Sequence, residues 1–378
     1  MSISAKKRII KKIDNAHLVW FEESNSWIQF EEPAWFVYRK FGSGAQTTDI
    51  SRKFAGRYGL NLVKSLVFVK DIISEVRKLS TATFHPEEIL SSEQIESLQI
   101  FFSTRKYYIK QNIVEISFGS RFLDYIIHQS LAHLETKKIS RPHFRIETFS
   151  LATSHILKIG SRAWVEDDAN MLKRRLFIEI SGLLYGKSDQ DWLSFVHGSA
   201  VSNESETIIL STASGSGKST LAALLCSQGL KFVSDDYVPI DRRFCKAYPF
   251  PAALSVKDGA YPILLPFYKQ LQNAEIFHFK GSRKTIRYLS FPQDGNFFKP
   301  LPVKNIVFVR YDPTKPFFFR KVPALEALRR YNEEAWVSPL PVNARKFINW
   351  FLRLNCYELE YSDNNMAIRE IKGLFKKI

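Results

Sequence analysis

Two short motifs in the second half of the chain contain residue types that can bind a nucleotide phosphate and the metal ion that accompanies it. The first follows an apolar, β-branched stretch from Thr207 to Leu210 and precedes a helical stretch from Leu221 to Cys226. It consists of Thr212, Ala213, Ser214, Gly215, Ser216, Gly217, Lys218, Ser219 and Thr220. Glycines let backbone N–H groups turn toward a phosphate, and the positive end of the following helix adds to the attraction. In this pattern a lysine reaches the β- and γ-phosphates and the next hydroxyl coordinates Mg²⁺, so the sequence predicts a site for ATP and Mg²⁺ at Lys218 and Ser219.

The loop departs from its usual pattern at the first position, where Thr212 takes the place of a glycine. A β-branched residue disfavours positive φ, so the first turn must adopt a conformation open to an L-residue, or phosphate affinity falls. The alternative is a Ser/Gly-rich turn that binds no ligand. The joint occurrence of strand, Gly-Lys-Ser and helix favours the phosphate loop.

The second motif is the carboxylate pair Asp235-Asp236, which follows a short apolar stretch from Leu230 to Val233. Only 17 residues separate Lys218 from Asp235, enough for one helix and one return strand. We therefore expect the second strand to lie parallel beside the first, with both ending at the sheet edge where such sheets bind ligands. One carboxylate can then hold Mg²⁺ while the other accepts a proton from an attacking hydroxyl. The alternative is a surface turn, in which aspartate is common.

His197 lies in a strand-like run from Trp192 to Val201, directly before the phosphate-loop strand. The polar residues from Asn203 to Glu206 predict a hairpin between the two strands. A histidine beside an acidic pair can tune or orient the base. A purely structural role is the alternative.

In their order and spacing, three segments resemble HPr serine kinase/phosphorylase and its related kinases. They are Val196-His-Gly-Ser-Ala-Val201, Ser214-Gly-Ser-Gly-Lys-Ser-Thr220 and Phe232-Val-Ser-Asp-Asp-Tyr237. The resemblance implies a mixed-sheet α/β domain that shares its nucleotide-binding fold with phosphoenolpyruvate carboxykinase. It also implies site roles: His197 near the catalytic carboxylate, Lys218 on phosphate, Ser219 and Asp236 on the metal, and Asp235 as the base.

Three further segments look like the related kinases: Pro249 to Lys257, Lys280-Gly-Ser-Arg283 and Val307 to Pro313. Lys257, Lys280 and Arg283 can stabilise a transferring phosphate, although solvated surface cations are the alternative. The Glu-Ile-Arg-Gly-type signature and the Gly-Arg-Asn loop of the HPr enzyme are not found. We therefore expect a substrate other than HPr and no phosphorolysis.

The N-terminal segment combines a predicted hairpin, from His17 to Phe21 and from Ser26 to Glu31, with two helices. Thr47 or Thr48 can cap the first helix and Gly59 can end it, and the second helix begins near Asn61. This pattern predicts a small α+β winged-helix-like unit.

The same segment resembles PqqD-like domains, which recognise precursor peptides. The resemblance rests on His17-Leu-Val-Trp-Phe, Trp27-Ile-Gln-Phe, Glu32-Pro-Ala-Trp35 and Asp49-Ile-Ser-Arg-Lys-Phe-Ala-Gly-Arg-Tyr58-Gly. It implies that a peptide adds to an exposed strand edge. A packing module or a degenerate winged helix is the alternative.

The polar stretch from Ser80 to Ser97 marks a boundary, so we divide the chain at residues 1–80, a linker at 81–100 and a kinase-like domain at 101–378. Between the linker and the motifs, strands are predicted at Tyr107 to Ile109 and Ile113 to Phe118. Helices are predicted at Arg121 to Leu134 and Met171 to Leu184.

Composition limits the partners and the location of the protein. The 378 residues are 45% hydrophobic and 14% aromatic, which excludes a disordered chain. Three cysteines without ligand spacing suggest neither a disulfide framework nor a zinc site, and no apolar run is long enough to span a bilayer. We expect a cytoplasmic protein without membrane contact. The net charge of +16 favours polyanions, but no cationic block interleaved with aromatics points to nucleic acid. A homo-oligomer is left open.

These observations predict an ATP-dependent kinase that phosphorylates a Ser or Thr hydroxyl of a protein or peptide, such as the precursor of a modified natural product. One alternative is a kinase for a small-molecule hydroxyl. Another is a nucleotide-binding adaptor that recruits a peptide without turnover, a reading that Thr212 and the missing signature support.

Overall fold

The computed structural model describes residues 8–82, 100–138, 140–151, 153–278, 285–293 and 296–375. The fold is mixed α/β, as the sequence predicts, with several separate sheets. The chain folds into two compact units. Unit 1 comprises Met1–Pro86 and Ser338–Ile348, and unit 2 comprises Glu87–Val337 and Asn349–Ile378. Most of the predicted linker lies outside the described residues.

Unit 1 contains an antiparallel sheet of three strands, β1 (Arg8–Ile13), β2 (Ala16–Phe21) and β3 (Ser26–Glu31), in the order β1-β2-β3. The β2–β3 hairpin confirms the predicted one, whereas β1 was not foreseen. Successive side chains of β2 point to opposite faces, so Val19 and Phe21 join one hydrophobic cluster and Trp20 joins another.

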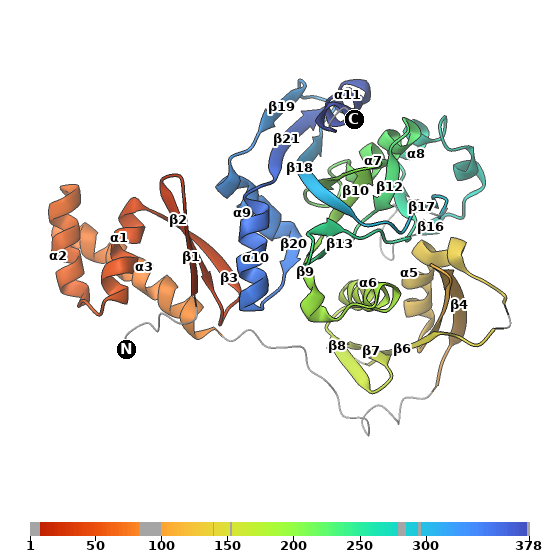
Figure 1. Ribbon diagram of the computed structural model, residues 1–378, viewed down its shortest axis with the longest axis horizontal. Helices are drawn as coiled ribbons and strands as arrows, with labels where there is room; N and C mark the ends of the chain where they lie inside the picture. Colours follow the sequence, from red (N-terminus) through yellow and green to blue (C-terminus); the bar gives the residue numbers. More distant parts are fainter. Residues whose placement is uncertain are drawn as a thin grey trace. The chain divides into compact units, whose positions relative to one another are not determined.

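Three helices of unit 1 pack on one another: α1 (Glu32–Gly42), α2 (Thr47–Tyr58) and α3 (Leu62–Thr81) (Figure 1). Helix α2 ends at Gly59, whose φ of 64° suits the left-handed position. Asn61 caps α3 by accepting hydrogen bonds from two backbone N–H groups. The expected threonine cap of α2 was wrong, because Thr47 is already the first helical residue and Gln46 occupies the cap position without a side-chain bond.

A late segment of the chain completes unit 1. Helix α10 (Pro341–Phe351) contributes its residues through Ile348 to this unit. Ala344 is fully buried against Ile9, Trp20 and Trp27, so the helix covers the sheet face opposite to Val19. The sequence division at residue 101 does not anticipate this return of the chain.

Unit 2 begins with a five-stranded sheet in the order β4-β5-β6-β7-β8, in which only β5 and β6 are parallel neighbours. Its elements are β4 (Ser103–Ile109), β5 (Asn112–Phe118), α5 (Arg121–Leu131), the 3₁₀ turn η2 (Ala132–Leu134), β6 (Phe144–Ser150), β7 (His155–Ile159), β8 (Arg162–Glu166), α6 (Ala169–Tyr185) and the 3₁₀ turn η3 (Asp189–Asp191). Strands β4 and β5 and both helices confirm the predicted elements.

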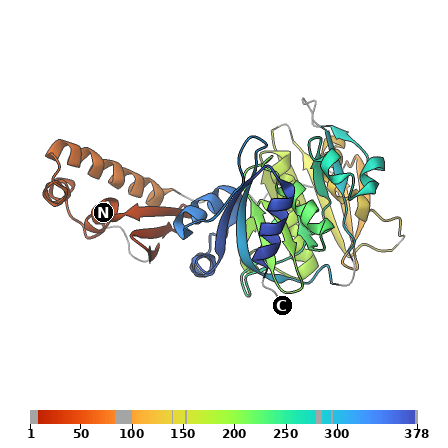
Figure 2. The same ribbon diagram turned by 90° about the horizontal axis from the view of Figure 1, so that it is seen from above.

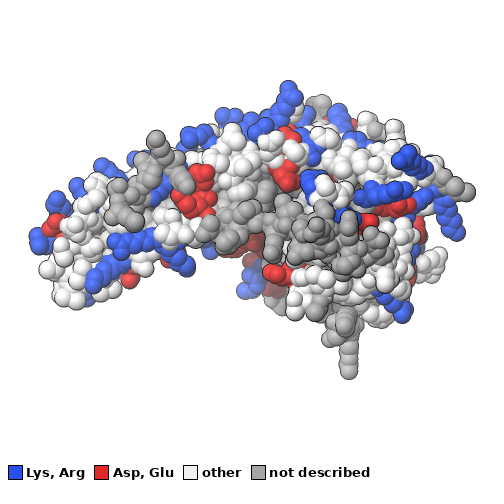
Figure 3. Space-filling model, turned by 90° about the horizontal axis from the view of Figure 1, so that it is seen from below, with Lys and Arg blue, Asp and Glu red and all other residues white. Residues whose placement is uncertain are grey.

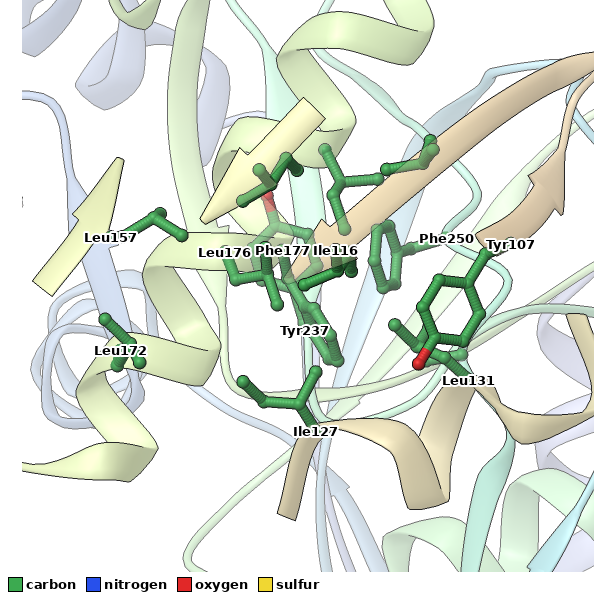
Figure 4. Close-up of a cluster of buried hydrophobic side chains, with 14 of the residues drawn as sticks. Tyr107, Ile116, Ile127, Leu131, Leu157, Leu172, Leu176, Phe177, Tyr237 and Phe250 are labelled. Carbon is green, nitrogen blue, oxygen red and sulfur yellow. The ribbon is translucent and has the colours of Figure 1, made fainter. Parts of the chain in front are cut away.

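Helix α6 packs against β7 and β8 and also shares a hydrophobic core with the strands that follow. Figure 4 shows part of this core, in which Phe177 of α6 lies close to Tyr237 and Phe250. The ring centroids of Phe177 and Phe250 are 4.6 Å apart. Through this core, α6 packs against the segment that contains the aspartate pair.

The central sheet of unit 2 has the order β12-β10-β11-β18-β14-β13-β9-β20, and β21 pairs with both β18 and β19. The strands are β9 (Trp192–Val196), β10 (Gly198–Ser202), β11 (Thr207–Ser211), β12 (Lys231–Ser234), β13 (Val238–Asp241), β14 (Lys246–Ala247), β18 (Leu301–Tyr311), β19 (Phe318–Lys321), β20 (Ala335–Val337) and β21 (Asn355–Tyr361). The strand-like run from Trp192 to Val201 is thus divided at His197 into two strands.

One expectation about this sheet was wrong. Strand β12 does not lie beside β11, because β10 pairs antiparallel with both and stands between them. The physical reason is the tight Asn203–Glu206 turn, which pairs β10 with one edge of β11, while the other edge pairs with β18. Strands β11 and β12 still run in the same direction, since each is antiparallel to β10.

The remaining elements of unit 2 surround this sheet. They are α7 (Lys218–Ser227), α8 (Tyr261–Leu264), η4 (Lys269–Asn273), α9 (Ala324–Glu334), α11 (Asn364–Leu374) and a small antiparallel sheet of β15 (Leu254–Lys257), β17 (Thr285–Leu289) and β16 (Phe277–His278). Helix α11 packs beside α7 and β21 (Figure 2).

Candidate functional site

The phosphate-loop motif forms a turn between a buried strand and a helix. All five residues of β11 are buried, and α7 begins at Lys218 with Gly217 in its cap position. Gly215 and Gly217 have φ angles of 88° and 96°, in the region that favours glycine. Thr212 has a φ of 157°, near the extended limit. The two glycines thus provide the left-handed turns of the loop.

The loop is held against the ends of the neighbouring parallel strands. The backbone N–H of Tyr311, at the end of β18, donates to the carbonyl oxygen of Ser216 at 2.9 Å. A Cβ atom on Gly217 would lie 2.9 Å from the Cβ of Tyr311 and 3.2 Å from the hydroxyl of Tyr361. Gly217 is therefore required by space as well as by φ.

The Lys218 side chain folds over the loop. Its Nζ donates to the carbonyl oxygen of Thr212 and, at 3.0 Å, to that of Ala213. Burial lowers the pKa of Lys218, while the charges of Asp236, Glu334 and Asp235 act in the opposite direction. The ammonium thus lies at the loop and within electrostatic reach of both aspartates.

Asp235 is directly bonded to the phosphate-loop helix. Its Oδ1 accepts a hydrogen bond from the Ser219 hydroxyl at 2.8 Å and from the Ser199 hydroxyl at 2.5 Å. Its Oδ2 accepts one from the backbone N–H of Ser255 at 3.1 Å. The residue is only 3% exposed, and burial together with the charge of Asp236 raises the pKa of Asp235 to about 7. Three donors and a buried position fix this carboxylate.

Asp236 has a different environment although it is the next residue. It is exposed, and its φ of 61° places it in the left-handed region, which aspartate tolerates better than most residues. Its charge raises the pKa values of His197, Lys218 and Lys173, in each case against the effect of burial. Asp236 is thus the solvent-accessible carboxylate of the site.

His197 lies at the break between β9 and β10, and its backbone N–H donates to the carbonyl oxygen of Glu334 at 2.7 Å. Burial lowers the pKa of His197, and the charge of Lys218 lowers it further, whereas Asp236 raises it. The structure therefore brings His197, Lys218, Ser219, Asp235 and Asp236 together, as the motifs predict.

Lys257 is also at the loop, with its Nζ 3.2 Å from the Ser214 hydroxyl. Lys280 and Arg283 lie outside the described residues. Sequence reasoning missed Ser255, Glu334 and Lys173. Ser199 and Ser255 stand within the quoted segments Val196 to Val201 and Pro249 to Lys257 and could have been found there, whereas Glu334 and Lys173 lie outside every quoted segment.

The oxygen atoms of Ser219 and Asp235 fit a Mg²⁺ site that phosphate and water complete, rather than a metal site built from protein ligands alone. Mg²⁺ in nucleotide sites takes one or two protein oxygens and completes its shell with phosphate and water. In the described part of the chain, no group of three or more His, Cys, Asp or Glu residues could hold a metal ion. The Ser219 hydroxyl, which is hydrogen-bonded to the Asp235 carboxylate at the start of α7, matches the protein oxygens of such a nucleotide-associated Mg²⁺ site.

A cavity of about 350 Å³ lies away from this site. It is lined by Ser227 near the end of α7, by Phe232 and Phe291, and by Lys231 and Lys299, among others. The rings of Phe232 and Phe291 are stacked with centroids 4.4 Å apart. None of the predicted site residues lines this cavity.

The surface charge is dispersed on the face shown in Figure 3, where Lys and Arg alternate with other side chains over the described residues. No described helix is both long enough and apolar enough to cross a membrane. No model of a known protein family matches this chain, and no curated protein is significantly similar to it.

Proposed function

We propose that this protein is an ATP-dependent kinase that transfers the γ-phosphate to a Ser or Thr hydroxyl of a protein or peptide. The observation that carries the proposal is the 2.8 Å hydrogen bond between the Ser219 hydroxyl and Asp235 Oδ1. It joins the start of the phosphate-loop helix to the carboxylate pair, and in phosphate-loop enzymes a loop hydroxyl and an aspartate of this kind hold Mg²⁺. We further infer an HPr-kinase-type domain in unit 2 and a winged-helix-like domain in unit 1.

The geometry favours a division of roles between the aspartates that is the reverse of the one implied by the family resemblance. Asp235 is buried and bonded to Ser219, so it suits the metal side of the site. Asp236 is exposed and within electrostatic reach of His197 and Lys218, so it can meet an incoming hydroxyl. We therefore propose Asp236 as the proton acceptor and Asp235 as the carboxylate that, with Ser219, holds Mg²⁺.

The other residues supply charge and orientation. Lys218 neutralises phosphate charge, and the loop N–H groups bind phosphate oxygens. His197, whose pKa is lowered by burial, can orient Asp236 or pass on its proton. Mg²⁺, when bound, neutralises charge on the β- and γ-phosphates. ATP and Mg²⁺ are available in the cytoplasm, the location that the sequence predicts.

Unit 1 is proposed to bind the peptide that carries the acceptor. Strand β3 pairs only with β2 among the described residues, so its other edge can accept an extended segment. Two residues of α3, Val63 and Val67, are 69% and 56% exposed and offer apolar contacts on this unit. Main-chain hydrogen bonds would supply affinity and such contacts specificity.

Two alternative functions are compatible with the same site. A small-molecule hydroxyl could be the acceptor, since nothing in the catalytic geometry requires a peptide. A nucleotide-binding adaptor without turnover is favoured by Thr212, the position at which the loop departs from the usual glycine.

The test uses the full chain with Mg²⁺ and γ-labelled ATP. We expect Mg²⁺-dependent ADP release, and label transfer to a candidate peptide encoded beside this gene. Label in a small molecule would favour the first alternative. Tight ATP binding with no ADP release, with or without peptide, would favour the adaptor and contradict the kinase.

A further inference from the structure

Lys173 of α6 is a cation beside the aspartate pair, and it belongs to neither the phosphate-loop motif nor the aspartate motif. Its Nζ lies 5.5 Å from the ring centroid of Phe177, one helical turn further along. Phe177 in turn lies close to Tyr237 (Figure 4), which it meets edge-on with centroids 6.2 Å apart. Tyr237 directly follows Asp236 in the chain. This packing places the Lys173 face of α6 against the segment that carries the aspartate pair.

Lys173 and Lys218 approach the aspartates from different layers of the fold. Lys218 begins α7, which packs on β10 of the central sheet, whereas Lys173 belongs to α6, which packs on β7 and β8. Both lysines interact electrostatically with Asp235 and Asp236. Only Lys218 also interacts with Lys257, the lysine bonded to the phosphate loop. Lys173 therefore reaches the aspartate pair from an element other than the phosphate-loop helix.

The Lys173 ammonium has unused capacity for an anion. Within the described residues it makes no hydrogen bond and no ion pair within 4 Å, and the group that it meets is the Phe177 ring. The side chain is half-buried, and burial lowers the pKa of Lys173. A desolvated ammonium without a close counter-ion is costly, and a bound anion would offset that cost.

We propose that Lys173 is a further catalytic residue, the acceptor-side cation that contacts the γ-phosphoryl group during its transfer. In the transfer, the acceptor hydroxyl gives its proton to Asp236, and its oxygen forms a bond to the γ-phosphorus. The bond from that phosphorus to the β–γ bridging oxygen breaks, and ADP leaves with the electron pair. Negative charge on the equatorial oxygens then lies between Lys218 and Lys173, so both lysines stabilise the transition state.

This inference rests on the proposed kinase function and makes a separate prediction. A side chain that contacts only the transferring phosphoryl group should contribute little to the affinity for ADP and much to the affinity for a transition-state analogue. The probes are Mg²⁺·ADP alone and Mg²⁺·ADP with tetrafluoroaluminate, which occupies the position of the transferring group. Titration calorimetry on the full chain gives the affinity for each, without an identified acceptor.

We expect Lys173→Met to bind Mg²⁺·ADP as the wild type does and to bind the tetrafluoroaluminate complex at least about tenfold more weakly. Lys173→Arg, which keeps the charge, should recover part of this loss. The matched control is Lys137→Met, which removes an exposed lysine of the same unit and should change neither affinity.

The outcomes separate the two hypotheses. Equal losses for both probes would assign Lys173 a structural or general binding role and overturn the inference, as would unchanged affinity for the tetrafluoroaluminate complex. A wild-type protein that binds neither probe would instead contradict the proposed function, and the role of Lys173 with it.

Discussion

Ser219 and Asp235 are joined by a 2.8 Å hydrogen bond although the strands that precede them, β11 and β12, are separated by β10. The bond is possible because α7 starts at the same sheet edge at which β12 ends. It makes the first turn of the phosphate-loop helix and the buried carboxylate one connected unit. The other predictions of function build on this connection.

Substitution of the two aspartates should separate metal binding from proton transfer. Asp236→Asn should lower phosphoryl transfer by about 10²-fold or more, the usual contribution of a general base, with little change in Mg²⁺·ATP affinity. Asp235→Asn should weaken nucleotide binding mainly when Mg²⁺ is present. Titrations with a fluorescent ATP analogue, with and without Mg²⁺, together with ADP release, measure both effects.

The control for these variants is Asp71→Asn, an exposed aspartate of α3 that should leave both measurements unchanged. If Asp235→Asn removes transfer while Mg²⁺·ATP affinity stays as in the wild type, Asp235 is the base, as the family resemblance implies.

The two loop glycines should differ in their tolerance of a methyl group. Gly215→Ala and Gly217→Ala both impose positive φ on an L-residue, which costs about 1 to 2 kcal/mol. Only Gly217→Ala also places a Cβ 2.9 Å from Tyr311, whereas nothing lies within 4 Å of a Cβ at Gly215. We expect Gly217→Ala to lose nucleotide affinity at least about tenfold more than Gly215→Ala. Comparable losses in the two variants would show that packing against Tyr311 does not matter.

The buried carboxyl of Glu179 should make stability depend on pH. Burial, followed by the charge of Asp189, raises the pKa of Glu179 to about 7, against the effect of Arg175. The folded state therefore retains a proton that the unfolded chain loses near pH 4.5. This contribution to stability is fully present below pH 4.5 and is lost as the pH rises through 7.

Glu179→Gln should remove this pH dependence, which amounts to at most about 3 kcal/mol between pH 4.5 and 7. Calorimetric unfolding of the wild type and the variant across this range gives the difference in the free energy of unfolding. The control Glu333→Gln alters a side chain that is 62% exposed and should follow the wild type at each pH. A constant difference between Glu179→Gln and the wild type would contradict the raised pKa.

The return of α10 to unit 1 can be tested by placing a charge in its buried face. Ala344 is 0% exposed against Ile9, Trp20 and Trp27, so Ala344→Asp should destabilise unit 1 by several kcal/mol, about 3 or more, because it buries an unpaired charge. Hydrogen exchange of the β1–β3 amides should accelerate. Arg345→Asp, at the exposed neighbouring position, should have little effect. Unchanged exchange in Ala344→Asp would show that α10 does not cover this sheet.

The phosphate loop and several turns and caps could be predicted from the sequence because they depend on residues that are close along the chain. The positions of Gly215, Gly217 and Lys218 between a β-branched strand and a helix are fixed within about 15 residues, so the loop could be recognised without the fold. The same holds for the hairpin of β2 and β3 and for the cap at Asn61, since turns and caps depend on near neighbours.

Tertiary structure alone decided which distant residues meet. The pairing of β12 with the outer edge of β10, the contact of Ser255 with Asp235, and the approach of Lys173 and Glu334 to the site depend on strand order and on core packing over long separations. The burial of Asp235 beside the exposed Asp236 is of the same kind, because two adjacent and chemically identical residues differ only in what the fold places around each. Sequence spacing fixes which groups are near along the chain, whereas solvent exposure and charge environment are properties of the packed whole.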